Sequence, residues 1–312
     1  MDVKRPDVGR LPNLLVVGVP KAGTGSLFAY LTQHGDICGA DEKEVGYFNF
    51  YNPQRHSGAP PPVESYMRHF ARCGGERYAV EATPTYSYGG SPVIAAVQDI
   101  LASPKVILSL RNPVDRLWSA YTFQRTLGNI TGLQSFPEYL KACESRARDG
   151  SDLVPRDHLH GLYIGLYENY VRLWLDAFGD DIKVVFAEDL SRDPTRVMSE
   201  VFGWLGIDDF APELDLAPRN TTKHARSPRL AKAVFSVKRS TERLGLVPAG
   251  VKRPVRRMYE RINAAELPET LEPEMRRHVE ELYRASNAAT AEALKDHGYR
   301  DLPGWLESAA TG

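Results

Sequence analysis

Short, largely apolar runs recur along the chain, and each is followed by a turn and then by apolar positions at helical spacing. The clearest runs are residues 14–17, 105–110 and 182–186, and a shorter one covers residues 77–81. Runs without polar alternation are typical of strands that are buried on both faces of a parallel sheet. The pattern therefore predicts an α/β fold with a central parallel sheet and helices on both faces. In such folds ligands bind at the carboxyl ends of the strands.

Between these runs, apolar residues recur at the spacing of amphipathic helices. Pro113 and Pro194 suit first helical turns, and Asp193 can cap the helix that Pro194 begins. A long C-terminal helix is expected after Pro273. The other predicted helices cover residues 24–33, 63–73, 91–101, 136–148 and 167–178.

The composition limits what kind of protein this is. The chain has 312 residues, enough for a large core, and its 39 Lys and Arg nearly balance its 40 Asp and Glu. Wholesale binding to nucleic acid is therefore not indicated. No window approaches about 18 uninterrupted apolar residues, so stable membrane insertion is not expected either. We predict a single soluble domain over residues 1–312, with a helical insertion at 231–267.

The cysteines and the N-terminus give a prediction of location. Cys38, Cys73 and Cys143 are widely spaced, odd in number and not in C-x-x-C form. This usage indicates a reducing compartment without structural zinc. The first residues lack the apolar core of a signal peptide. We therefore expect a cytoplasmic protein.

The loop after the first run has the composition of an anion site. Gly18, Gly23 and Gly25 give backbone freedom and leave room for a ligand, and Thr24 and Ser26 can cap the helix that follows. Exposed amides and the positive end of the helix dipole favour a phosphate there. Lys21 adds a full charge. The alternative is a glycine-rich turn with a solvated lysine.

The letters of this loop, P-K-A-G-T-G-S over residues 20–26, resemble the 5′-phosphosulfate loop of sulfotransferases that use 3′-phosphoadenosine 5′-phosphosulfate (PAPS). They differ from the nucleotide-triphosphate loop, in which a glycine-lysine pair and a hydroxyl residue stand at the helix start. The resemblance implies a P-loop-like fold and PAPS as co-substrate. It also implies a set of cofactor-binding residues, which are Lys21, Ala22, Gly23, Thr24, Gly25 and Ser26.

Two further segments extend the nucleotide site. K-V-I-L-S-L-R-N-P-V-D-R-L-W-S-A-Y, residues 105–121, resembles the second sulfotransferase signature, which implies that Arg111 and Ser119 bind the 3′-phosphate of PAPS. An ordinary ion pair and a helix-packing serine are the alternative for these two residues. The basic loop over residues 220–230 is an imperfect match to the family's nucleotide-covering loop. Lys223 and Arg226 are the predicted contacts there, and a solvated basic surface is the alternative.

Candidate acid–base residues lie outside the loops. K-E-V-G-Y-F, residues 43–48, resembles the K-E-x-x-[FY]-F segment of the heparan-sulfate-type sulfotransferases, which implies that Glu44 is the base on the acceptor. His160 is a second candidate. It is not expected to bind metal, because no Cys or carboxylate partner has ligand spacing.

The segment E-A-T-P-T-Y, residues 81–86, matches the family's G-E-K-[ST]-P-x-Y in part. Ala82 replaces the lysine of many eukaryotic members, and Gly46 stands where some members have histidine. These departures argue against copying a carbohydrate specificity.

Together the segments predict sulfuryl transfer from PAPS to a hydroxyl or amine of a small-molecule, glycolipid or glycan acceptor, with adenosine 3′,5′-bisphosphate (PAP) as product and no metal required. Glu44 and Lys21 would be catalytic. Two alternatives stay open: a P-loop small-molecule kinase, which would need ATP and magnesium, and a non-catalytic nucleotide-binding or scaffold protein.

Overall fold

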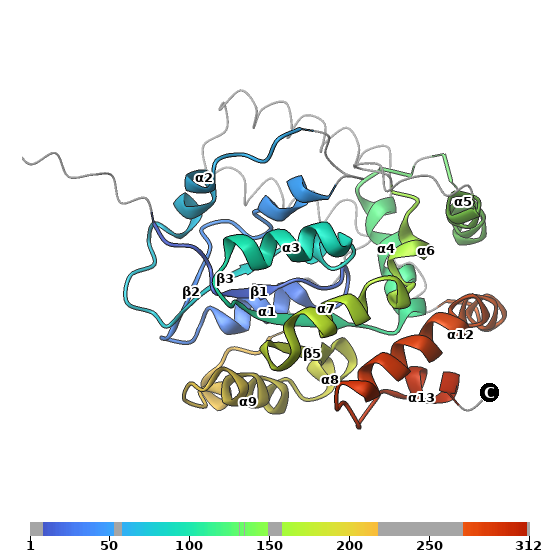
Figure 1. Ribbon diagram of the computed structural model, residues 1–312. Coiled ribbons are helices and arrows are strands. Elements are labelled where there is room, and N and C mark those ends of the chain that lie inside the picture. The colour runs from blue at the N-terminus through green and yellow to red at the C-terminus, as the bar shows by residue number, and fades with distance from the viewer. Residues whose placement is uncertain are drawn as a thin grey trace, which may run out of the picture.

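A central parallel sheet of five strands organises the structure, a computed structural model (Figure 1). The structure describes residues 9–52, 58–130, 132–133, 135–148, 158–217 and 271–310. The predicted helical insertion at 231–267 and the predicted contacts Lys223 and Arg226 lie outside the described residues.

The strand order is β2-β3-β1-β4-β5, and every pairing is parallel. The expected α/β architecture is confirmed. One short strand was missed by the sequence analysis, the three-residue β2. The strands are β1 (Leu14–Val16), β2 (Ile37–Gly39), β3 (Tyr78–Ala82), β4 (Lys105–Leu110) and β5 (Ile182–Phe186).

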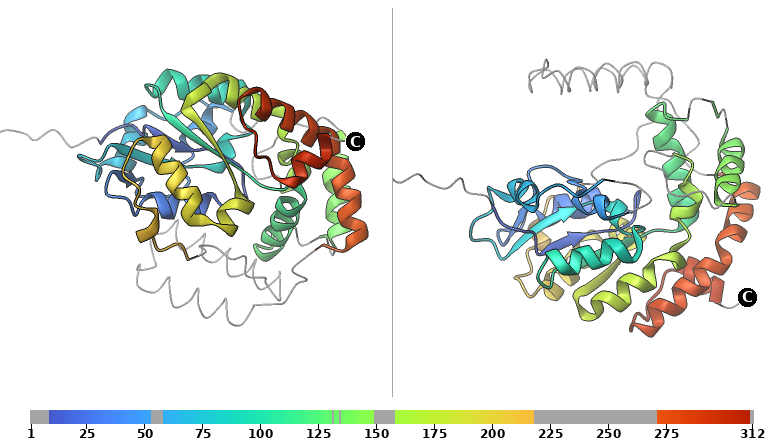
Figure 2. Two further views of the ribbon diagram at one scale, coloured as in Figure 1. Left: turned by 90° about the horizontal axis from the view of Figure 1, so that it is seen from below. Right: turned by 45° about the horizontal axis from the view of Figure 1, so that its top comes forward.

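Helices cover both faces of the sheet, and alternate residues of β1 point to opposite layers. Leu15 packs with α3 (Gly90–Ile100) and α7 (Val171–Phe178) in one core cluster. Leu14 and Val16 pack in a second cluster, with α1 (Thr24–Leu31) and α9 (Pro194–Leu205). The left panel of Figure 2 shows the sheet between these two helical layers. Burial on both faces explains why the strands read as apolar runs.

A third group of helices lies on one side of the sheet, in line with the chain that leaves β4 (Figures 1 and 2). It consists of α4 (Pro113–Thr126), α5 (Phe136–Arg148), α6 (Gly161–Ile164) and part of α12 (Pro273–Asp296), which share an apolar cluster. None of the described helices is long and apolar enough to cross a membrane. The remaining elements are η1 (Tyr47–Tyr51), α2 (Val63–Met67), η2 (Arg68–Phe70), η3 (Pro84–Tyr86), η4 (Tyr167–Asn169), η5 (Gly179–Asp181), α8 (Ala187–Arg192), η6 (Ala211–Glu213) and α13 (Gly304–Ala310).

Several predicted helix starts are confirmed. Pro113, Pro194 and Pro273 each occupy the first turn of their helices. The Asp193 carboxylate accepts a hydrogen bond from the amide of Arg196 at 3.1 Å, which is the expected cap of α9.

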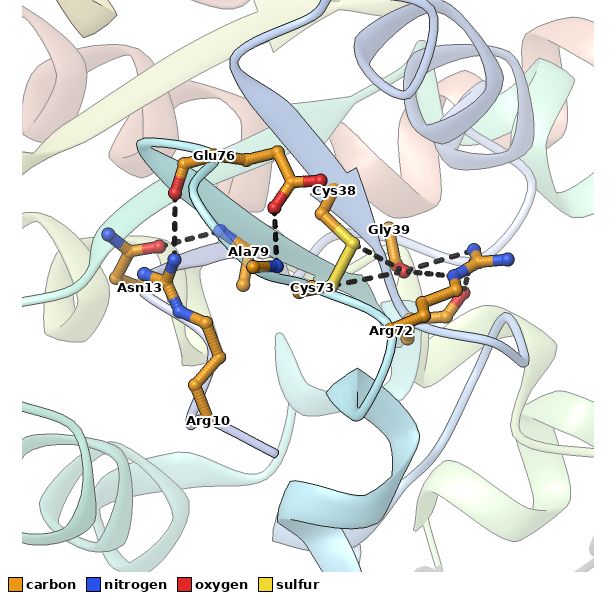
Figure 3. Close-up of a disulfide and its surroundings, with 10 residues drawn as sticks. Arg10, Asn13, Cys38, Gly39, Arg72, Cys73, Glu76 and Ala79 are labelled. Carbon is orange, nitrogen blue, oxygen red and sulfur yellow. Dashed lines mark hydrogen bonds between the residues drawn. A yellow bond between two sulfur atoms is a disulfide. The ribbon is translucent and has the colours of Figure 1, made fainter. Parts of the chain in front are cut away.

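The cysteines depart from the sequence-based expectation. Cys38 at β2 and Cys73 form a disulfide, whereas Cys143 is a buried free thiol. The prediction of a reducing compartment did not anticipate this bond. Figure 3 shows that the Arg72 guanidinium lies beside the disulfide and donates to the carbonyl of Gly39. The same guanidinium also donates to the carbonyl of Ala40. The chain that leaves β2 is thus held by both a covalent and a polar link.

Candidate active site

The loop after β1 lies tightly against β4. The amide of Val19 donates to the carbonyl of Ser109 at 2.5 Å, so pairing with β4 continues past the end of β1. A Cβ atom on Gly18 would lie 2.3 Å from Leu108 Cδ1. A larger residue at this position would force the buried Leu108 side chain or the loop itself to shift.

The loop then turns so that free amides meet at the start of α1. Lys21 and Gly23 have positive φ angles of 76° and 81°. Within the described residues, the amides of Gly23, Thr24 and Gly25 donate to no carbonyl or side chain. Amides in the first turn of a helix, together with the helix dipole, bind anions. The loop therefore has the backbone geometry of an anion site.

The predicted capping of α1 by hydroxyl groups is wrong. Gly23 is the N-cap residue, and no side chain provides a capping hydrogen bond. Thr24 is buried at the first helical position. The amide of Ser26 bonds to the Gly23 carbonyl at 2.9 Å. The positive φ of the N-cap explains the difference, since glycine adopts it without the steric cost of a side chain.

The second segment is joined to the first by side chains at the end of β4. The Ser109 hydroxyl donates to the Ala22 carbonyl, and Arg111 Nη1 donates to the Lys21 carbonyl at 3.1 Å. These bonds turn two loop carbonyls toward β4 and away from the anion site. Arg111 and the first loop, about ninety residues apart in the sequence, are thereby brought together.

Hydrogen bonds from other elements fix the backbone at Arg111 and Asn112. The Tyr167 hydroxyl donates to the Arg111 carbonyl at 2.6 Å. The next residue, Asn112, caps α4 by accepting from the amide of Val114 at 3.0 Å, and its own amide donates to the Glu188 carboxylate at 2.7 Å. Burial raises the pKa of Glu188. Three hydrogen bonds therefore hold the backbone at the start of α4.

Lys21 lies among several charges. Burial and the nearby positive charge of Arg111 lower the pKa of Lys21 to about 8, whereas the negative charge of Glu44 opposes the shift. Lys21 Nζ lies 4.2 Å from the centre of the Phe123 ring, within cation–π distance. Arg111 and Glu44 thus both lie close enough to Lys21 for their charges to act on it.

Helix α4 directs one face toward Lys21. Ser119 and Phe123 are four residues apart and share this face. Phe123 is 38% exposed and is one of the two exposed large apolar residues in the described part of the chain. The sequence analysis missed Phe123. Its position one turn after Ser119 was the available signal.

Glu44 is accessible. Its φ of 66° places it in the left-handed region, as does the φ of 75° at Gly46. The Glu44 side chain is 55% exposed and pairs with Lys43 Nζ at 2.7 Å. The carboxylate is therefore accessible to solvent in this position.

Comparison with known proteins identifies the family of the chain. Residues 11–285 match the sulfotransferase domain family. The chain belongs to this sulfotransferase family. The match includes both loops, Glu44 and most of α12.

Relatives of this chain include larger proteins. The chain is 26% identical to the bifunctional heparan sulfate N-deacetylase/N-sulfotransferase of Drosophila melanogaster over 97% of its own length and 28% of the relative's. It is 28% identical to human bifunctional heparan sulfate N-deacetylase/N-sulfotransferase 1 over 65% of its length and 23% of the relative's. It thus spans about a quarter of the length of these relatives. A sulfotransferase from Alicyclobacillus acidocaldarius shares the fold, with a TM-score of 0.65 and 24% identity over 95% of this chain and 99% of that one.

His160 has different surroundings from the other candidate site residues. It is 8% exposed and directly precedes α6. The Arg116 guanidinium, buried in α4, donates to the carbonyl of the next residue, Gly161. Within the described chain, no group of three or more His, Cys, Asp or Glu side chains could hold a metal ion. Burial makes His160 less suited than Glu44 to contact an acceptor.

Proposed function

We propose that this sulfotransferase transfers the sulfuryl group of PAPS to a hydroxyl or amine. The observation that supports this most directly is the bond from Arg111 to the Lys21 carbonyl, which joins the two proposed nucleotide-binding segments. The exposed carboxylate of Glu44 lies near this junction, as its effect on the pKa of Lys21 indicates. The proposed donor site and the proposed base would therefore act side by side.

For the donor, the free amides at the start of α1 would bind the 5′-phosphate and sulfate, with Ala22 and Ser26 completing the loop. Arg111 and Ser119 would bind the 3′-phosphate. The free amides and positive charges fit a polyanionic nucleotide. Lys223 and Arg226, outside the described residues, are proposed to cover it. PAP would be the product.

In the reaction, Glu44 would accept the acceptor's proton as the acceptor oxygen or nitrogen forms its bond to sulfur. The bond from sulfur to the 5′-phosphate oxygen breaks, and Lys21 would neutralise the charge that develops on that oxygen. Catalysis would rest on positioning and electrostatics, as in phosphoryl transfer. We propose neither a covalent intermediate nor an obligatory metal.

The acceptor is proposed to be a small molecule, a glycolipid or a glycan precursor. The relatives' names include heparan sulfate, which supports testing amino and hydroxyl sugars first. Ala82 at the end of β3 removes a cation that many eukaryotic members have, so the acceptor contacts would differ from theirs. Phe123 offers an apolar surface beside Lys21.

We propose that residues 1–312 act as one sulfotransferase domain. The cytoplasmic location stays a prediction from the sequence. The Cys38–Cys73 bond is an observation against it, because disulfides persist mainly in oxidising compartments. Thiol labelling of the protein in its native cells would decide this point.

The donor is tested by thermal unfolding with PAP and, separately, with ATP plus magnesium. A ligand that binds only the native state must raise the unfolding midpoint. We expect a rise with PAP alone. A rise with ATP and magnesium alone would refute the proposal in favour of a kinase.

The base is tested by Glu44→Gln in a turnover assay with PAPS and a panel of amino and hydroxyl sugars. Loss of a general base should lower kcat at least about 100-fold while leaving PAP affinity nearly unchanged. Glu42→Gln, a change at an exposed residue of the same segment, is the matched control and should retain activity. Wild-type turnover in Glu44→Gln would remove Glu44 from the mechanism.

A further inference from the structure

A buried carboxylate lies beneath the segment that carries Glu44. Glu81 precedes the last residue of β3 and is 0% exposed. It accepts hydrogen bonds from the hydroxyls of Tyr66, Thr83 and Tyr86, the last two at 2.5 and 2.8 Å. Within the described residues, no Lys, Arg or His forms an ion pair with Glu81. A buried carboxylate held only by hydroxyl and amide donors requires a specific explanation.

Two of these hydroxyls act as relays to the chain after Glu44. The Thr83 hydroxyl accepts from the amide of Gly46 at 3.1 Å, and the Tyr86 hydroxyl accepts from the amide of Phe48 at 3.2 Å. A hydroxyl has one proton, so in each relay that proton is directed to Glu81. Every donor around the carboxylate therefore points inward, which is the arrangement that an ionised acceptor needs.

The side chain that carries the third hydroxyl packs on the residue between these two. Tyr66 donates to Glu81, and its ring stacks on that of Tyr47 with 4.5 Å between centroids and 4° between planes. Glu81 is thus linked to three successive residues, Gly46, Tyr47 and Phe48. The links to Gly46 and Phe48 run through their backbone amides, and the link to Tyr47 runs through its ring.

The contacts that Glu81 makes with residues 46–48 lie next to a backbone position of unfavourable conformation. Glu44 has a φ of 66°, a conformation that is costly for a residue with a side chain and persists only when its surroundings impose it. Burial raises the pKa of Glu81, and the hydrogen bonds from Thr83, Tyr66 and Tyr86 oppose this rise. The Gly46 amide also donates directly to Glu81 Oε1 at 3.3 Å and further opposes the rise, so the placement of the carboxylate and that of residue 46 are coupled.

We propose that Glu81 is a positioning residue, whose carboxylate fixes residues 46–48 and thereby aims Glu44 at the acceptor. This inference rests on the proposed role of Glu44 as base. Glu81 itself does not contact the acceptor. Its effect is transmitted by its direct bond from the Gly46 amide and by the side chains of Thr83, Tyr66 and Tyr86.

The test compares Glu81→Gln and Thr83→Val with Thr83→Ser, which keeps the relay hydroxyl. We expect kcat to fall at least about tenfold in the first two variants, with the KM for PAPS and the Kd for PAP within about twofold of wild type. Thr83→Ser should have a kcat close to that of the wild type, because it keeps the hydroxyl. Hydrogen exchange at the amides of Gly46 and Phe48 should be at least about tenfold faster in Glu81→Gln.

A merely structural role predicts another pattern, namely fewer active sites by PAP titration with an unchanged kcat per site. Thr290→Val, which removes a buried hydroxyl from α12, is the control for that effect. Wild-type kcat per site in both Glu81→Gln and Thr83→Val would overturn the positioning role if Glu44→Gln is inactive. Wild-type turnover in Glu44→Gln would instead refute the proposed base, so the two failures are distinguishable.

Discussion

The lowered pKa of Lys21 predicts that PAP binding weakens as the pH rises from 7 to 9. Burial and Arg111 bring this pKa to about 8 in the free protein. The ammonium form binds a phosphate, whereas the neutral amine does not. Arg111 and Arg116, the other positive groups that act on Lys21, stay charged over this range. The affinity for PAP is therefore expected to fall as the pH rises.

The size of the effect follows from the protonated fraction. With a pKa of about 8, Lys21 is about 90% protonated at pH 7 and about 10% at pH 9. If only the protonated form binds PAP, the Kd rises about tenfold between these values, or about 1.4 kcal/mol. A bound anion raises the pKa of Lys21 in the complex, so the decline continues beyond pH 8 without a plateau.

Isothermal titration calorimetry with PAP at several pH values from 7 to 9.5 and constant ionic strength would measure this dependence. Lys21→Arg is the matched control, because an arginine stays protonated throughout. Its affinity should be nearly independent of pH, even if its absolute value differs from wild type. A wild-type Kd that does not change over this range would refute the assignment of Lys21 to the phosphate site.

Three other predictions follow from the geometry. Arg111→Met should weaken PAP binding by about 2 kcal/mol, or roughly 30-fold by calorimetry, because charge-assisted bonds to phosphate are lost; unchanged affinity would exclude Arg111 from the site. Reduction of the bond between Cys38 and Cys73, or Cys38→Ala, should lower the free energy of unfolding by about 3 kcal/mol in urea titrations, and equal stability of the oxidised and reduced proteins would contradict a structural role. Gly18→Ala should cost about 2 kcal/mol in the same assay through overpacking, whereas Gly35→Ala, where a Cβ meets nothing within 4 Å, should be near neutral; equal effects would contradict the close approach of the loop to β4.

The sequence was most informative where local pattern and chemistry coincide. The apolar run of β4 leads directly to Arg111 and Pro113, so a strand end, a cation and a helix start could be placed from adjacent letters. Parallel strands end at one edge of the sheet, and this general rule predicted that Arg111 would meet the first loop. The bond from Arg111 to Lys21 agrees with that prediction.

The features that were missed depend on distant contacts or on backbone conformation. Cys38 and Cys73 are 35 residues apart, and nothing in their spacing indicates that they meet. The three residues of β2 are too few to show a period. Gly23 was not chosen as N-cap over Thr24, because side-chain preference was visible in the sequence and the φ of the loop was not.

The strand order has a consequence for how such an enzyme diverges. β1 lies at the centre, with β4 and its Arg111 on one flank and β3 with its Glu81 on the other. Under the proposed roles, the nucleotide is recognised from one flank and the reacting group of the acceptor is aimed from the other. Substitutions between residues 40 and 88 that keep Glu44, Glu81 and the hydroxyls around Glu81 can then alter the choice of acceptor without disturbing the donor. Exchange of this segment between relatives that share those residues becomes a route to new products.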